Sequence, residues 1–152
     1  SEKQLTFTVI ERCNKETEEL IAEEGTEFLA TKISYIKENQ AEFVYAEIAE
    51  LDHIRTDAFA LEFDEAFEVY TAMFAVALQR KYRADIQAHL LATLDLEQAN
   101  SSVAFEGVEG VWEMNIALDS MTGFRDDMTF GEVYDLLYTF VFTLLERIEQ
   151  AA

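Results

Sequence analysis

The C-terminal stretch 128–150, MTFGEVYDLLYTFVFTLLERIEQ, constrains the fold more than any other part of the chain. It carries no charged residue between Asp135 and Glu146. Thr129-x-x-Glu132 has the form of a capping box, which predicts a helix that begins at this point. A helix needs about 20 apolar residues to cross a bilayer. The shorter uncharged run therefore predicts a buried helix and no membrane crossing.

The polar residues of this predicted helix form one narrow stripe, and apolar residues cover the rest of its surface. A surface helix needs an apolar arc of a little over about 100°, and this arc is wider. It includes a second apolar line, Tyr134, Tyr138 and Phe142, beside the line that faces the core. Either a neighbouring helix of the same domain covers this second line, or a dimer or client subunit does. With Phe67 and Phe74 from that neighbouring helix, these are the interface candidates.

Most strands are predicted from the alternation of apolar and polar residues. Alternation with a period of two is typical of a strand that has one buried and one solvated face. Its clearest case is the run ADIQAHLLATLDL, in which apolar residues occupy every second position. The predicted strands lie at residues 5–10, 28–36, 42–51, 84–96 and 112–119, with a loop or short strand at 103–105.

Apolar spacings of three and four residues predict the remaining helices. Such residues recur from Phe63 to Leu78, which predicts a helix over 63–82. Asp64 is a suitable N-cap for this helix. A short exposed helix is also expected within residues 14–25, a segment rich in glutamate.

Together these elements predict an α+β fold: an antiparallel sheet of about five strands with two long helices packed on one face. The length of 152 residues fits a single domain over 1–152. The blocks 27–82 and 83–150 each read strand, strand, helix, which indicates a pseudo-repeat.

The chain is strongly acidic: 31 Asp and Glu against 11 Lys and Arg give a formal net charge of −20. The acids are spread along the chain and form no terminal tail. Such a surface repels phosphate backbones and anionic lipid heads, and it attracts basic proteins. We therefore expect no direct nucleic-acid binding, no membrane binding and a protein partner that is basic. Plain solubility is the alternative reason for the charge.

Few side chains of this chain suit catalysis or metal binding. His53 has Asp52 and Asp57 near it in sequence, but no second ligand motif supports a metal or acid–base site. His89 falls on the polar parity of a predicted strand, so it is expected at the surface. The one cysteine, Cys13, excludes an internal disulfide and fits a reducing cytoplasm, the predicted location. No catalytic residue, metal or cofactor is predicted, and we expect no enzyme activity.

The last quarter of the chain, VWEMNIALDSMTGFRDDMTFGEVYDLLYTFVFTLLERIEQ, resembles the last strand, short turn and long final helix of the type III secretion chaperone-like fold. The order hairpin, helix, hairpin and final helix extends this resemblance over residues 27–150. That family opens with an amphipathic helix, whereas this chain opens with a predicted strand. Members of the family and their sensory-regulator relatives are small, acidic, dimeric proteins of the cytoplasm. The resemblance implies a homodimer that holds a protein client.

The sequence thus predicts a non-enzymatic cytoplasmic protein-binding module, chaperone- or adaptor-like, in the form of an acidic homodimer. The alternative is an acidic inhibitor or immunity-type protein whose carboxylates mimic the charge of a nucleic acid. The two hypotheses differ in salt dependence, because binding through charge alone collapses as salt is added.

Overall fold

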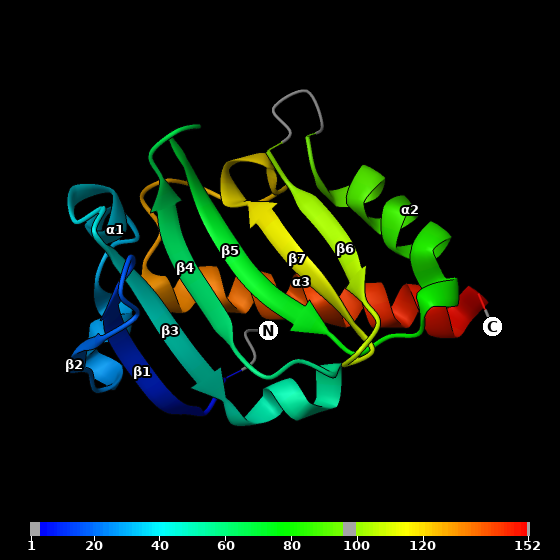
Figure 1. Ribbon diagram of the computed structural model, residues 1–152, viewed down its shortest axis with the longest axis horizontal. Helices are drawn as coiled ribbons and strands as arrows, with labels where there is room; N and C mark the ends of the chain where they lie inside the picture. Colours follow the sequence, from blue (N-terminus) through cyan, green and yellow to red (C-terminus); the bar gives the residue numbers. More distant parts are fainter. Residues whose placement is uncertain (1–3, 96–99, 152) are drawn as a thin grey trace.

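Seven antiparallel strands form one continuous sheet in the computed structural model of the chain, which describes residues 4–95 and 100–151 (Figure 1). The strands lie in the order β2-β1-β3-β4-β5-β7-β6, so β2 and β6 are the two edges. Their bounds are β1 (Phe7–Asn14), β2 (Leu20–Glu23), β3 (Glu42–Ile48), β4 (Phe59–Asp64), β5 (Val69–Val76), β6 (Ser102–Glu106) and β7 (Val111–Ala117).

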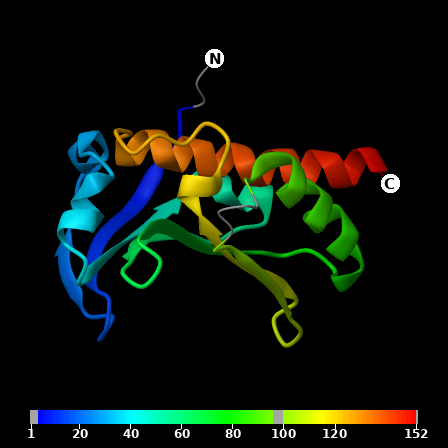
Figure 2. The same ribbon diagram turned by 90° about the horizontal axis from the view of Figure 1, so that it is seen from above.

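One face of this sheet is covered by the longest helix, α3. Figure 2 shows α3 running across the width of the sheet, with α2 beside it. Both edges of the sheet bend away from α3 in this view, which makes the opposite face concave. Among the described residues the helices are α1 (Ser34–Glu38), α2 (Arg83–Thr93) and α3 (Phe130–Ala151). Short 3₁₀ turns lie at Thr26–Ala30, Ala49–Ile54, Arg80–Tyr82 and Leu118–Ser120.

The hydrophobic core lies between the sheet and α3. In the inner strands β3, β4, β5 and β7, every second residue points toward α3 and is buried, as are Phe59, Leu61 and Phe63 of β4. From α3, Tyr134 packs its ring against the rings of Phe7 and Phe59, with centroids 5.4 and 6.3 Å apart. Burial of one large apolar side chain contributes about 1.5–3 kcal/mol. This layer of large side chains therefore holds α3 on the sheet, and the predicted closing helix is confirmed.

The segment 63–82, predicted as a helix, forms most of a β-hairpin. Asp64, the predicted N-cap, instead closes the turn between β4 and β5. Its carboxylate accepts hydrogen bonds from the backbone N–H groups of Ala66 and Phe67, at 2.9 and 3.0 Å. The aromatic residues of this segment suit a strand as well as a helix, and pairing with neighbouring strands decides between them. The α+β prediction holds, but the sheet has seven strands rather than about five.

The segment 84–96, predicted as a strand, forms helix α2 as far as Thr93, and its last residue lies outside the described part of the chain. Alanine and leucine dominate this run, and their high helix propensity outweighs the alternation. α2 packs on α3 and buries Ile86 and His89. The surface position predicted for His89 is wrong, since its side chain is only 2% exposed.

Two shorter predicted elements are also corrected. Residues 14–25 form a turn and β2 instead of a helix, because the Asn14 side chain accepts hydrogen bonds from two N–H groups of the turn. Residues 28–36 lie in a 3₁₀ turn and α1 instead of a strand. This segment is tied to the loop before α3, where the Ile33 N–H donates to the Met128 carbonyl oxygen at 2.8 Å.

The other predicted strands are confirmed: those at 5–10, 42–51 and 112–119 correspond to β1, β3 and β7, and the short strand at 103–105 corresponds to β6. None of the described helices combines the length and the apolar character that a membrane crossing requires.

The predicted pseudo-repeat is not reproduced in the order of elements. Block 27–82 ends in the β4–β5 hairpin, whereas block 83–150 has a helix before its two strands and another after them. The described strands of both blocks belong to the same sheet and the same core.

Candidate binding face

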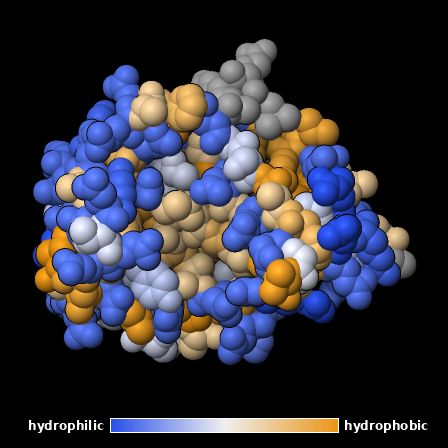
Figure 3. All heavy atoms as spheres, viewed as in Figure 1, coloured by the Kyte–Doolittle hydropathy of each residue, from blue (hydrophilic) through white to orange (hydrophobic). Residues whose placement is uncertain are grey.

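The face of the sheet opposite α3 is open and is the strongest candidate for a binding site. Directly paired residues of antiparallel strands point to the same face. Register pairs therefore define a row of side chains across this face, from β1 to β7. The row consists of Glu11, Tyr45, Ala60, Met73 and Asn115. Figure 3 looks directly onto this surface, which we call the concave face.

Small side chains and one methionine form the floor of the concave face. The two central strands place Ala60, Thr71, Met73 and Ala75 there, and we call these four residues the floor. Figure 3 shows that the middle of the face is hollowed and apolar, with hydrophilic atoms around it. The large rings of the same strands point to α3. A partner can therefore approach the backbone of β4 and β5 closely.

Carboxylates border the floor on two sides. Glu11 and Glu47 lie on the β1 and β3 side, and Glu113 of β7 lies on the other side, opposite Ala75. Within residues 4–95 and 100–151, none of these three carboxylates forms an ion pair with a lysine or arginine. Their charge is therefore directed at whatever approaches the concave face.

At one end of the floor a carboxylate is compensated by a positive charge. There the Lys15 Nζ lies 3.9 Å from Glu62 Oε2 and donates a hydrogen bond to the Phe63 carbonyl oxygen at 2.6 Å. Burial raises the pKa of Glu62, and the charge of Lys15 opposes that shift. The acidic borders thus lie beside the floor, and a compensated pair lies at its end.

Tyr45 stands between the floor and the carboxylates of β1 and β3. Its phenol donates a hydrogen bond of 2.5 Å to Glu47 Oε2. Burial, this hydrogen bond and the charges of Glu47, Glu11 and Asp57 raise the pKa of Tyr45 to about 12. The phenol therefore stays protonated. It offers an aromatic surface beside negative charge, a combination that favours a cationic side chain.

The predicted interface residues divide into buried and exposed ones. Tyr134, Tyr138 and Phe74 are buried in the chain's own core. Phe142 is 42% exposed and stacks its ring on Tyr138, with centroids 6.3 Å apart. Phe67 is 62% exposed in the turn between β4 and β5. Only Phe67 and Phe142 of the five are thus accessible in a single chain.

The apolar periodicity of the sequence does not predict the floor, because it assigns Met73 and Ala75 to a helix. A signal for it is nevertheless present in the two strands. In FALEF (59–63) the large residues at 59, 61 and 63 alternate with Ala60 and Glu62, and in YTAMFAV (70–76) Thr71, Met73 and Ala75 share the other parity from the rings of Tyr70 and Phe74. Such a period of two indicates strands whose two faces carry different kinds of side chain.

The two histidines and the cysteine are not assembled into a reactive group. His53 is exposed in the turn after β3, and Cys13 is buried on β1. His89 Nε2 donates to the Phe140 carbonyl oxygen at 2.8 Å, and its Nδ1 lies 3.5 Å from Arg147 Nε. A guanidinium can only donate, so Nδ1 accepts and the ring is neutral. Among the described residues, no three His, Cys, Asp or Glu side chains are placed to hold a metal ion.

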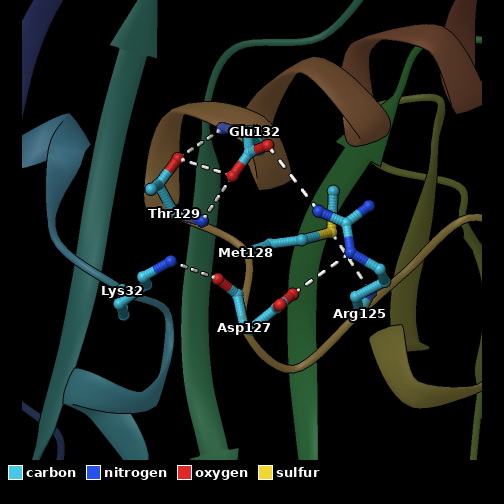
Figure 4. Close-up of polar contacts among 6 residues, drawn as sticks. All are labelled: Lys32, Arg125, Asp127, Met128, Thr129 and Glu132. Atoms are coloured by element: carbon cyan, nitrogen blue, oxygen red, sulfur yellow. Dashed lines mark hydrogen bonds and ion pairs between the residues drawn. The ribbon is translucent and has the colours of Figure 1, made fainter.

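A hollow of about 450 Å³ lies at the N-terminal end of α3. The capping box predicted there is confirmed: the Thr129 N–H donates to Glu132 Oε1 at 2.9 Å, and the Glu132 N–H donates to Thr129 Oγ1 at 3.2 Å (Figure 4). Arg125 approaches the other Glu132 oxygen at 3.8 Å, and Lys32 donates to the Asp127 carbonyl oxygen at 2.8 Å. The chain's own side chains thus occupy this helix end, which leaves the concave face as the better candidate.

Comparison of the chain with known protein families, with curated proteins and with solved structures gives no match. The resemblance to secretion chaperones therefore stays a prediction based on the order of elements. A fold alone does not define a function, so the concave face is the basis for proposing one.

Proposed function

We propose that this chain is a non-enzymatic protein-binding module, chaperone- or adaptor-like, that holds its partner on the concave face. The observation that carries the proposal is an apolar floor bordered by carboxylates that have no basic partner among the described residues. A sheet face that only meets water normally carries polar residues. Ala60, Met73 and Ala75 fit contact with another molecule better than contact with solvent.

The chemistry of this face favours a partner that is both apolar and basic. The floor offers contact area, and the carboxylates around it are complementary to lysine and arginine. A net charge of −20 also speeds the approach of a basic partner and repels an acidic one. The homodimer and the cytoplasmic location predicted from the sequence remain parts of the proposal.

Site-specific photocrosslinking tests the proposed face. A photoreactive phenylalanine analogue replaces Met73 on the floor or, in a matched protein, Thr139 on the exposed side of α3. Each protein is irradiated in extract of the native host. We expect defined protein adducts from position 73 that are absent from position 139. Equal labelling from both positions, or none from position 73, would contradict the proposal.

The alternative, an acidic mimic of nucleic acid, is favoured by Glu11, Glu47 and Glu113, which form no ion pair with a lysine or arginine among the described residues. It differs from the first proposal in its use of the floor. A charge mimic loses its partner at high salt, and its binding does not depend on the alanines. Crosslinks at position 73 that persist in high salt favour the apolar floor, and crosslinks that vanish favour the mimic.

A further inference from the structure

The concave face has a geometry that specifies its occupant further, on the basis of the proposed function. Tyr45, Ala60, Met73 and Asn115 form one row across the sheet. β3 and β5 run in the same direction, because each is antiparallel to β4, so Glu47 and Ala75 lie two residues beyond this row on the same side of it. Ala75 is paired with Glu113. The floor residues of β4 and β5 thus lie between Glu47 on one side and Glu113 on the other.

The distance between these carboxylates matches a helix. Glu47 on β3 and Glu113 on β7 are separated by three strand spacings, which at about 4.8 Å each amount to about 14 Å. An α-helix with its side chains is about 10–12 Å across. A helix laid along β4 and β5 therefore fills the floor and brings its two flanks beside the carboxylates.

The hydrogen bonding of the sheet also favours a helix over an extended segment. β4 is paired with β3 and β5, and β5 is paired with β4 and β7, so neither central strand has a free edge. An extended segment laid on the floor would find no backbone partners, and unpaired backbone groups are costly to bury. A helix satisfies its own backbone groups.

We infer that the concave face binds a basic amphipathic helix of a partner protein, laid along β4 and β5. Its apolar stripe contacts Ala60, Met73 and Ala75, and lysine or arginine on its two flanks faces Glu47 and Glu113. Tyr45, with Glu11 across from it, is placed to receive one arginine by stacking and charge. The eight residues of β5 extend about 26 Å, which corresponds to about 18 residues of helix.

A designed peptide of about 18 residues tests this inference with the intact chain. Leucines form one helical stripe, and arginines and lysines flank it on both sides. A scrambled peptide of identical composition has no stripe, and a third peptide carries a central proline that breaks the helix. Fluorescence anisotropy measures the affinity of each. We expect the helical peptide to bind at least about tenfold tighter than the other two, because only it presents apolar and basic groups together.

Variants of the chain locate the bound peptide. Ala75→Arg places a bulky positive charge on the floor, of the same sign as the charges of the peptide. We expect it to weaken binding of the helical peptide at least about tenfold. Glu47→Gln and Glu113→Gln each remove one border charge, with an expected loss of about two- to fivefold. Glu146→Gln removes the same charge from the exposed side of α3 and is the matched control, with no expected change. Thermal melts check that every variant folds.

The inference is overturned if the scrambled or proline peptide binds as well as the helical one, or if Glu146→Gln costs as much as Glu113→Gln. Binding is then nonspecific attraction between opposite charges. Failure of the inference and failure of the proposed function are distinguishable. If host proteins still crosslink at position 73 while no helical peptide binds, the concave face binds a partner of another shape. If position 73 gives no adduct either, the proposed function fails as well.

Discussion

His89 shows how one buried side chain can make stability depend on pH. Burial lowers the pKa of His89 below its ordinary value of 6.5, and the nearby Arg147 charge acts in the same direction, while the hydrogen bond to the Phe140 carbonyl opposes them. A depressed folded-state pKa gives stability that is present above the unfolded value and is lost as pH falls. The interface between α2 and α3 is therefore expected to weaken in mild acid.

Urea unfolding at about pH 7.5 and about pH 5.5 measures this effect on either side of the ordinary histidine pKa. We expect the native chain to lose more stability between these values than His89→Gln, which cannot be protonated. His53→Gln removes the exposed histidine and serves as the control, with the same loss as the native chain. A His89→Gln protein with an unchanged pH dependence would show that this ring does not contribute.

Thr129 makes a second prediction at the scale of one side chain. Its hydroxyl accepts the Glu132 N–H at the first turn of α3, which would otherwise lack a partner within the helix. Thr129→Ala is expected to reduce the free energy of unfolding by about 1 kcal/mol. Thr139→Ala, at an exposed position within the same helix, is the matched control and should cost nothing. Equal losses from both changes would mean that the cap contributes no stability.

At the scale of elements, the β4–β5 hairpin separates two aromatic residues that a helix would place on one face. Phe74 is buried against Phe59 and Phe140, with ring centroids 5.2 and 6.4 Å away, whereas Phe67 lies exposed in the turn. Phe74→Ala should therefore cost about 3–5 kcal/mol of unfolding free energy. Phe67→Ala should change it by less than about 0.5 kcal/mol. Comparable losses in chemical denaturation would contradict the hairpin.

Three segments of the chain show which elements the sequence can and cannot predict. The helix at 130–151 was predictable because its capping box, its length and its apolar stripe all agree. Residues 63–76 and 84–93 were not, because each run fits two periods at once. Residues 63–76 form strands because they pair with strands that are distant in sequence. Residues 84–93 form a helix because their helix propensity outweighs the alternation. The concave face depends on the first of these choices, so its floor became visible only with the strand register.

At the scale of the whole molecule, the two faces of the sheet carry apolar side chains of different size. Large side chains fill the space under α3, and alanines, a threonine and a methionine line the concave face. The acids are distributed around both, so the charge does not by itself mark a site. What distinguishes the concave face is the combination of its floor with carboxylates that form no ion pair with a lysine or arginine among the described residues.

This whole-molecule charge leads to opposite salt dependences for two kinds of association. Two copies of a chain with net charge −20 repel each other, and salt screens this repulsion, since the Debye length falls from about 10 Å at 0.1 M to about 3 Å at 1 M. The predicted homodimer should therefore become stronger as salt is added. Binding of a basic helix to the concave face should become weaker over the same range, but it should persist because the floor supplies apolar contact.

Sedimentation velocity of the chain alone and anisotropy of the helical peptide, measured between about 0.05 and 0.5 M salt, check both trends. Glu113→Gln should flatten the salt dependence of peptide binding and leave that of the dimer unchanged, because Glu113 borders the floor on the concave face. Phe142→Asp is the corresponding change on α3, where it adds a charge at the most exposed ring of that helix. It should weaken a dimer formed through α3 without affecting the peptide. A dimer that dissociates as salt is added would show that attraction between unlike charges, and not apolar contact, joins the two copies.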